Sequence, residues 1–437
     1  MCPLVGPRTI HAMAKVSEPT RSDRVGDKQR TLRYLAFFEA MAGLEDEGPL
    51  WHSLSAGLVT LRLVDQWLAR GGSEAGADQW AIQAVRQQIE CVPPTDPARA
   101  ILDGIVGEVE RPGEAAAARI APRLMAYGRS LDFGGRWALA AELFETVLAF
   151  IDPIVDSDLA IAAQFRLAFC RRVLGQLDLA EQDYATAGRM AANVGDAGNT
   201  LRSTVGLAKV AMARGNLPLA ERMLDGVAQK AVAPELRPIR AIALHDRATV
   251  AIMREEHERA IGLLNEALPD VSSASDRDRV IADIALGFLH LGVHSAARDA
   301  YMVVAATAAE QFSRWSATVN LLHLAAADEM EPAFEQYRRQ LAGQPLTPEL
   351  STQYYLALGS GLRRFGRVEQ AREALAAGIR VAEEHGLNVE LFRLERELQA
   401  LERGEAAERR RATIAPPSVE AVATKMRDMK EVALATT

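Results

Sequence analysis

The stretch RGNLPLAE, residues 214–221, places a glycine inside otherwise helical sequence and an alanine five positions after it. Three similar stretches occur elsewhere in the chain: LGQLDLAE (174–181), LGVHSAAR (291–298) and FGRVEQAR (365–372). A glycine ends a helix readily because it adopts the left-handed conformation at low cost. An alanine early in the next helix lets two antiparallel helices approach closely. Each stretch therefore predicts the joint of a helix–turn–helix unit.

The same interval is found seven times in one phase. The turn residues are Gly135, Gly175, Gly215, Glu255, Gly292, Asp328 and Gly366, spaced 40, 40, 40, 37, 36 and 38 residues apart. Five positions after each stands an alanine, and nine positions after each stands a large apolar or aromatic residue. The large residue lies on the same helix face as the alanine and fills the space between the paired helices. Units repeated at this period need neighbours to bury their apolar faces.

Composition favours helices and gives no sign of a membrane or nucleic-acid partner. The 437 residues are 49% hydrophobic and only 5% aromatic, and Ala, Leu, Glu and Arg outnumber β-branched residues. The formal charge is −8, which argues against binding to nucleic acid or to a membrane surface. Three cysteines (Cys2, Cys91 and Cys170) lie far apart and predict neither a disulfide framework nor a metal cluster. With no apolar run of 18 residues and no signal-peptide pattern, we expect a cytoplasmic protein.

The repeat resembles the tetratricopeptide (TPR) family. With the turn residue at position fifteen, YLALGSGL (355–362) carries Tyr, Leu, Gly and Leu at 355, 358, 359 and 362, where TPRs have an aromatic residue, Leu, Gly and an apolar residue. The joints MAANVGDAGN (190–199) and VAEEHGLN (381–388), together with the period of 36–40 residues, are similar to the longer TPR arrays of bacterial signal-sensing regulators. The resemblance implies an all-α fold, a right-handed superhelical solenoid of antiparallel helix pairs.

The pattern divides the chain into five segments. We expect a disordered N-terminal segment (1–28), a helical extension (29–117) that includes a degenerate repeat with Ala98, Leu102 and Ile105, and seven repeats (118–385). A helix over 386–411 would cap the exposed face of the last repeat. Residues 412–437 would form a flexible tail. An apolar stripe at residues 418–434 allows a short amphipathic helix that docks on a partner or back on the array, but such a helix is too short to be stable alone.

The resemblance places ligand-contacting residues on the first helix of each pair. In TPR proteins that helix lines the inner surface, mainly through positions two, five, nine and twelve of the repeat. These positions give a candidate peptide site in repeats one to four, with two aromatic rings among basic side chains: Arg129, Phe165, Phe169, Arg172, Arg202, Lys209, Met212 and His245. Apolar anchors beside arginines suit a peptide with acidic character. The alternative is that both phenylalanines belong to the core between repeats and that the bases are only solvated.

The sequence contains no recognisable active site. His290 and His294 flank the turn at Gly292, so they do not share a helix face, and no HExxH motif occurs. LGSGL (358–362) lacks the first glycine of a nucleophile elbow, and no phosphate-binding glycine loop is present. We therefore predict no enzyme activity, no catalytic residues, no cofactor and no metal.

The function predicted from the sequence is that of a scaffold or adaptor that binds a peptide segment or partner protein in the concave groove. The alternative is a peptide- or effector-responsive signalling or transcriptional regulator that acts through a separate effector protein. The sequence does not indicate the oligomeric state or the partner.

Overall fold

The computed structural model describes residues 33–44, 46–70, 78–111, 116–405 and 413–435. The predicted disordered segment 1–28 lies outside these residues. The chain divides into two compact units, Met1–Val210 and Ala211–Thr437, here called the N-terminal and the C-terminal unit. The structure is 80% helical and the described residues contain no β-strand, which confirms the predicted all-α fold of TPR-like helix pairs.

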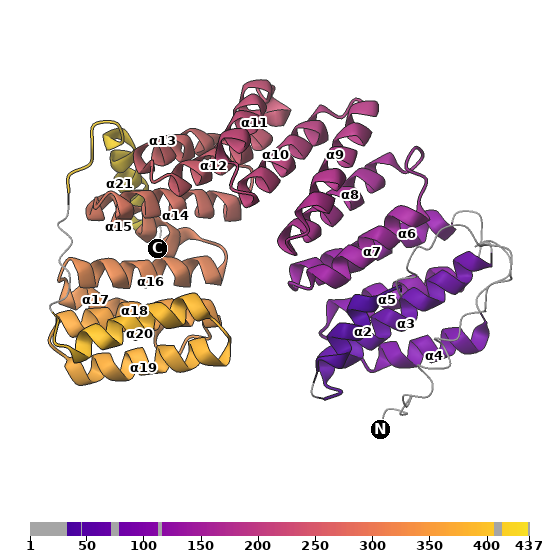
Figure 1. The fold of residues 1–437 in the computed structure, drawn as a ribbon, viewed down its shortest axis with the longest axis horizontal. Helices are drawn as coiled ribbons and strands as arrows, with labels where there is room; N and C mark the ends of the chain where they lie inside the picture. Colours follow the sequence, from indigo (N-terminus) through magenta and orange to yellow (C-terminus); the bar gives the residue numbers. More distant parts are fainter. Residues whose placement is uncertain (1–32, 45, 71–77, 112–115, 406–412, 436–437) are drawn as a thin grey trace. The chain divides into compact units, whose positions relative to one another are not determined.

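The N-terminal unit consists of four helices that precede the repeats, followed by the first repeats (Figure 1). Its helices are α2 (Leu35–Ala42), α3 (Pro49–Ala69), α4 (Gln79–Glu90), α5 (Pro97–Val109), α6 (Ala116–Phe133), α7 (Trp137–Phe150), α8 (Ser157–Val173), α9 (Leu177–Asn193) and most of α10 (Ala197–Ala213). A continuous apolar core runs from α2 to α8, so the extension, repeat one and the first helix of repeat two share one core. Ala98, Leu102 and Ile105 of α5 are buried in it.

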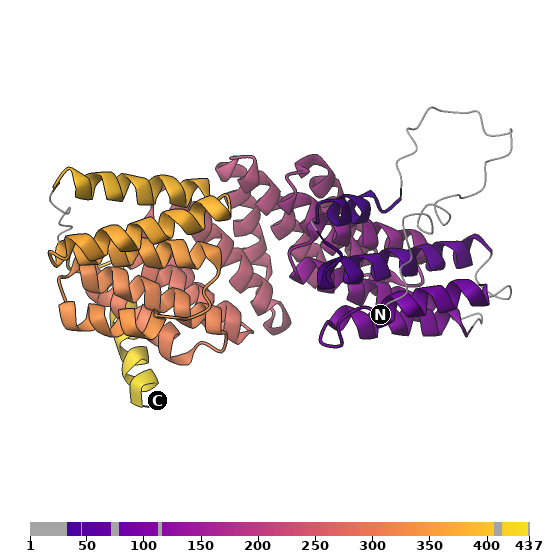
Figure 2. The same cartoon turned by 90° about the horizontal axis from the view of Figure 1, so that it is seen from below.

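The C-terminal unit contains the remaining pairs. Its helices are α11 (Leu217–Lys230), α12 (Arg237–Met253), α13 (His257–Ala267), α14 (Ala274–His290), α15 (His294–Thr307), α16 (Gln311–Ala327), α17 (Glu331–Leu341), α18 (Pro348–Arg364), α19 (Val368–Glu384), α20 (Asn388–Glu402) and α21 (Glu420–Ala435), with 3₁₀ turns at Pro234–Leu236 and Leu268–Asp270. Consecutive helices lie side by side, as α18, α19 and α20 do in Figures 1 and 2. Repeats four to seven are the pairs α12–α13, α14–α15, α16–α17 and α18–α19.

Every turn between the two helices of a repeat has the same hydrogen bonds. In repeat two the Gly175 N–H donates to the Arg172 carbonyl at 3.1 Å, and the Gln176 N–H donates to the Arg171 carbonyl at 2.8 Å. These two bonds form a Schellman motif, which requires a left-handed residue. That residue has φ between 56° and 76° in all seven repeats. The alanine five positions on is fully buried in six of the seven repeats.

Repeat six departs from the predicted register by one residue. Its left-handed residue is Glu329, with φ 56°, and not Asp328. The position five residues on is therefore Phe334, which is fully buried, and the predicted Ala333 is only half-buried. A bulky ring fits there because the facing residue of α18 is Gly361, where a Cβ atom would lie 2.1 Å from the Phe334 ring. The prediction was wrong because this turn has no glycine and Ala333, which served as the marker, lies one residue before the buried position.

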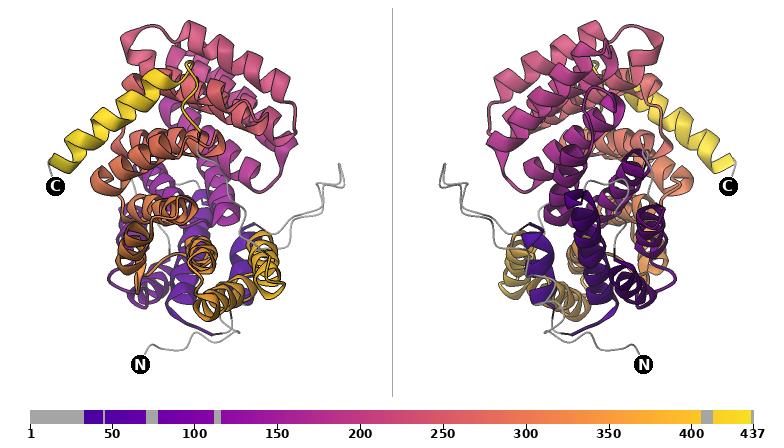
Figure 3. Two further views of the ribbon diagram at one scale, coloured as in Figure 1. Left: turned by 90° about the vertical axis from the view of Figure 1, so that its left-hand side faces the viewer. Right: turned by 90° about the vertical axis from the view of Figure 1, so that its right-hand side faces the viewer.

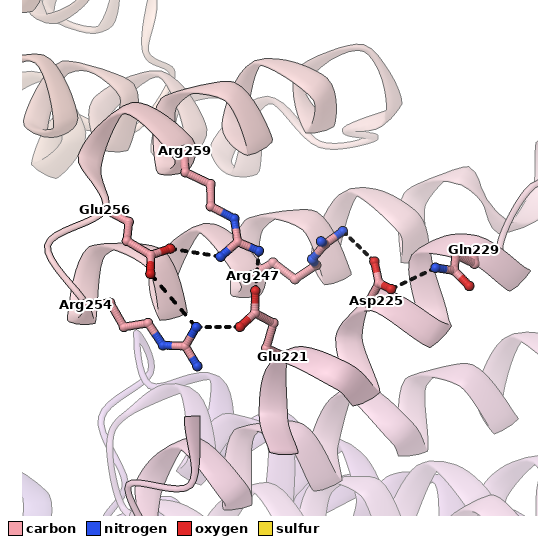
Figure 4. Close-up of polar contacts among 7 residues, drawn as sticks. All are labelled: Glu221, Asp225, Gln229, Arg247, Arg254, Glu256 and Arg259. Atoms are coloured by element: carbon pink, nitrogen blue, oxygen red, sulfur yellow. Dashed lines mark hydrogen bonds and ion pairs between the residues drawn. The ribbon is translucent and has the colours of Figure 1, made fainter. Parts of the chain in front are cut away.

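Ion pairs connect successive repeats, and Figure 4 shows those between repeats three and four. Glu221, on α11, contacts Arg254 at 2.6 Å and also Arg259, so it joins repeat three to the turn and second helix of repeat four. Glu335, at the same position of repeat six, contacts Arg367 in the turn of repeat seven at 2.6 Å. Burial raises the pKa of Glu221 and of Glu335, but the hydrogen bonds donated by the arginines outweigh it and leave each pKa below its usual value.

We expect the free energy of unfolding to depend on which residue type occupies the left-handed position of the turn. Glu255 is exposed with φ 62°, so Glu255→Gly should raise the free energy of unfolding by about 1 kcal/mol because the backbone strain disappears. Gly215→Ala is the matched reverse change in the preceding repeat, where an added Cβ would meet no atom within 4 Å. It should lower the stability by a similar amount. Urea denaturation of both variants tests this, and equal midpoints would contradict it.

Acid should weaken the inter-repeat ion pairs. Because the pKa of Glu221 is lowered by folding, its contribution is complete above the pKa of the unfolded chain and is lost as the pH falls through the folded value. Glu221→Gln should therefore cost on the order of 1 kcal/mol at pH 7, and this cost should shrink as the pH is lowered below the pKa of the unfolded glutamate. Urea midpoints of both proteins over a falling pH series measure this. A constant difference between wild type and variant would show that the charge does not stabilise the joint.

Candidate functional site

A cavity of about 450 Å³ lies on the first helices of the last repeats in the C-terminal unit. Four of its lining residues are arginines, two from α18 (Arg363 and Arg364) and two from α20 (Arg393 and Arg396). The remaining lining residues come from α14, α16, α18 and α20 and combine apolar and polar side chains with one acid, Glu397: Leu289, Val319, Asn320, His323, Ala326, Ala327, Gln353, Leu356, Ala357, Ser360 and Glu397.

The repeat explains why these side chains converge. Counted from the left-handed residue as position fifteen, Gln353, Leu356, Ser360 and Arg363 occupy positions two, five, nine and twelve of repeat seven. In repeat six, counted from Glu329, positions five, nine and twelve are Val319, His323 and Ala326. The first helices of neighbouring repeats stack, so equivalent positions form one continuous surface. Helix α20 follows α19 and adds its two arginines at the end of this surface.

The charges in this arginine cavity are only partly compensated. Arg363 is 9% exposed, contacts Glu397 at 2.9 Å and also donates to the carbonyl of Glu405, so its side chain is held in place. Arg393 and Arg396 are exposed and have no hydrogen-bond or ion-pair partner within the part of the chain that the structure describes. The guanidinium groups of Arg393 and Arg396 therefore give the cavity unpaired positive charge in an acidic chain.

This arrangement suits an anionic ligand with an apolar part. Guanidinium groups bind carboxylates in pairs of parallel hydrogen bonds, which gives orientation as well as affinity. The amide side chains of Asn320 and Gln353 can donate to and accept from a peptide backbone. The apolar floor, formed by Val319, Ala326 and Leu356, can hold an aliphatic side chain.

The two phenylalanines predicted as peptide anchors are half-buried in the N-terminal unit. The Phe165 ring lies 6.3 Å from that of Tyr184, between the helices of repeat two. Phe169 packs against the main N-terminal core, and the Arg172 guanidinium carbon lies 5.3 Å from its ring centroid. The Arg172 Nε atom is buried without a hydrogen-bond partner among the described residues. These contacts resemble inter-helix packing more than an open binding surface.

The other predicted residues do not form a single cluster. Arg129 and Arg202 are exposed, and Arg202 donates a long hydrogen bond of 3.4 Å to Asn199. Lys209 belongs to the N-terminal unit, whereas Met212 and His245 belong to the C-terminal unit. His245 Nε2 lies 2.6 Å from an Asp283 oxygen, so this side chain connects α12 to α14. The proposed site in repeats one to four therefore remains a prediction.

The arginine cavity was not predicted, although the positional rule that gave the site in repeats one to four also identifies it. In repeat six the one-residue error at the turn would have selected Thr318 and Leu322, which are buried between helices, in place of Val319 and His323. Arg393 and Arg396 gave no signal in the sequence, because a terminal helix is expected to cover the array and not to line a surface.

Among the described residues no group of three His, Cys, Asp or Glu side chains is suited to a metal ion. Ser360 lies in the arginine cavity on α18, and His323 and Glu397 are among the other lining residues. Glu397 forms an ion pair with Arg363 at 2.9 Å. Each helix within these ranges is too short or too polar to cross a lipid bilayer.

Comparisons with known proteins concern the fold only. No protein-family model and no curated protein matches the sequence. Among solved structures, the chain is similar to a Rap protein complexed with Competence and Sporulation Factor, with 12% identity over 80% of this chain and 98% of that one and a TM-score of 0.39. It is also similar to the apo quorum sensor NprR from B. thuringiensis, with 10% identity over 84% and 92% and a TM-score of 0.39.

A third similar structure is a putative kinesin light chain from Podospora anserina with TPR-like repeats, at 20% identity over 42% of this chain and 92% of that one, with a TM-score of 0.32. We draw no functional argument from likenesses at this level. The turns, the buried small residues and the paired helices nevertheless identify the chain as an all-α protein built of TPR-like repeats.

Proposed function

We propose that this protein is a non-catalytic binding module that holds an acidic peptide segment of a partner protein in the arginine cavity of the C-terminal unit. One observation carries the proposal: Arg393 and Arg396, without partners among the described residues, lie beside Arg363 and Arg364 around a cavity of about 450 Å³. Exposed arginines beside an apolar floor create a local positive potential that attracts an anionic ligand. A peptide with an aliphatic residue next to one or two carboxylates has the matching chemistry.

The position of the cavity also supports a peptide over a small metabolite. The lining residues come from three stacked first helices and the terminal helix α20, so the surface continues along the array and does not close around a compact molecule. Asn320 and Gln353 lie along this surface, where amide groups can pair with an extended backbone. Ser360 supplies a further hydroxyl on the same helix as Gln353.

A selection experiment tests this function. Random 12-residue peptides displayed on phage would be selected on the full chain, and we expect enrichment of Asp and Glu beside an aliphatic residue. The best peptide, labelled with fluorescein, should bind the Arg393→Ala/Arg396→Ala variant at least tenfold more weakly, because each charged hydrogen bond contributes about 1.5–3 kcal/mol. Its affinity should also fall with rising salt.

Two controls make the outcome specific. Arg380→Ala removes an exposed arginine from α19, which does not line the cavity, and should leave the affinity unchanged. The quadruple variant Phe165→Ala, Phe169→Ala, Arg172→Ala and Arg202→Ala tests the rival site in repeats one to four. Loss of binding in the quadruple variant alone, in a protein whose circular dichroism is unchanged, would move the site there. Selected peptides without acidic residues would refute the proposed ligand.

The regulator alternative differs from the scaffold only in the consequence of binding. A sensor would bind its peptide and then alter its contact with a separate effector protein. Affinity purification with and without the selected peptide distinguishes the two: a scaffold retains the same partners, and a sensor gains or loses one.

A further inference from the structure

The C-terminal helix α21 is bound to the outside of the array. It packs against α15 and α13, the second helices of repeats five and four, and Figures 1 and 3 show it in yellow, apart from the stacked first helices. Its docking face is an apolar stripe of Val419, Val422, Met426 and Ala433, each 5% exposed or less. The stripe has the spacing of one helix face.

Two of the three bases of α21 contact the array. Lys425 Nζ contacts Asn265 at 2.8 Å and Lys430 Nζ contacts Asp299 at 2.7 Å, whereas Arg427 is 59% exposed and lies 4.0 Å from Asp299. Its three acids, Glu420, Asp428 and Glu431, are all exposed. Asp299, on α15, is 13% exposed and is therefore largely covered when α21 is in place. The contact is selective in charge as well as in shape.

The face of α15 under this helix is more buried than the equivalent faces of α11 and α19. Ala296, four residues after the turn, is 3% exposed, whereas the equivalent Leu219 of α11 is 37% exposed and Gln370 of α19 is also exposed. Ala300 and Val303, on the same side of α15, are 0% and 3% exposed. Small residues at this spacing form a shallow groove that lets a second helix approach closely. A groove of this kind would be apolar and open to solvent without an occupant.

Hydrogen bonds also hold residues 413–418, which precede α21, on repeats four and five. The Thr413 N–H donates to the carbonyl of Gly292 at 2.8 Å, and its hydroxyl donates to the carbonyl of Leu291 at 2.7 Å. Ser418, before the helix, contacts Glu258 on α13. These bonds fix the segment at the turn between α14 and α15.

The size of the contact suggests that it can exchange. A helix of 16 residues is marginal in water, so folding and docking of α21 are coupled and part of the interaction energy is spent on ordering it. Few apolar side chains are buried, which corresponds to a small interface. Tethering compensates, because a short linker gives the attached helix an effective concentration of about 1 mM.

We propose that the face formed by α13 and α15 is a second binding site, specific for an amphipathic helix with basic residues on its docking side, and that α21 is its resident ligand, bound within the same chain and exchangeable. This site is independent of the arginine cavity, which lies on first helices. A partner helix with the stripe and bases of α21 would have to displace α21 to bind.

A labelled peptide corresponding to residues 413–437 tests this in the full chain. The wild-type chain should bind it weakly, because the tethered copy competes. The Met426→Asp chain, in which the resident helix is weakened and the groove is intact, should bind it at least tenfold more tightly. Adding Asp299→Lys to Met426→Asp should abolish this gain, and a peptide carrying Lys430→Glu should restore it. Glu431→Lys, on the solvent side of α21, should behave as wild type.

Three outcomes would overturn the proposal. Equal binding to wild-type and Met426→Asp chains would mean that α21 is a permanent part of the fold. Undiminished binding after Asp299→Lys would place the peptide elsewhere. A wild-type dimer that becomes a monomer with Met426→Asp, measured by light scattering, would mean that α21 binds a second copy. If Met426→Asp reduces helicity by more than the loss of α21 accounts for, Lys430→Glu in the full chain is the alternative variant. It removes the contact with Asp299 and weakens the docking of α21 without changing the apolar stripe.

Discussion

The hydrogen bond from the residue after each left-handed turn back to the carbonyl five residues earlier sets the geometry of the whole chain. This bond is 2.8–2.9 Å long in all seven repeats. It ends the first helix at a defined residue and starts the second at a defined angle, so every later position of the repeat falls on a fixed face. The buried alanine, the large residue that follows it and the inner positions of the first helix all depend on this one backbone conformation.

This dependence on the turn conformation explains how much of the fold could be predicted from the sequence. Glycine marks the turn in five of the seven repeats, and the alanine after it places the second helix correctly in six. The prediction failed in repeat six, where the residue types at the turn differ from those in the other repeats. Glu329 adopts φ 56° without being glycine, and Phe334 replaces the alanine because Gly361 makes room for it. A compensating pair of this kind lies 27 positions apart and leaves no local signal.

The binding surfaces were less predictable than the fold for a physical reason. A repeat pattern states which face a residue occupies but not whether a neighbour neutralises or covers it. His245 occupies an inner position and contacts Asp283, whereas Arg393 and Arg396 lie on an expected capping helix and line a cavity. The apolar stripe of residues 418–434 was visible in the sequence. Its receptor, the groove of Ala296, Ala300 and Val303, could not be identified, because small residues are abundant throughout the array.

The ion pairs between repeats differ in which repeat carries the acid and which carries the base. Glu221 and Glu335 are acids that meet arginines of the following repeat, but Arg298, at the same position of repeat five, meets Asp328 with the charges reversed. Moving repeat five to another place would put Arg298 opposite Arg254 or Arg367. Recombination or duplication of whole repeats is therefore restricted by charge. The repeats share one backbone geometry, but the charges at the contacts between them allow only some orders of the repeats.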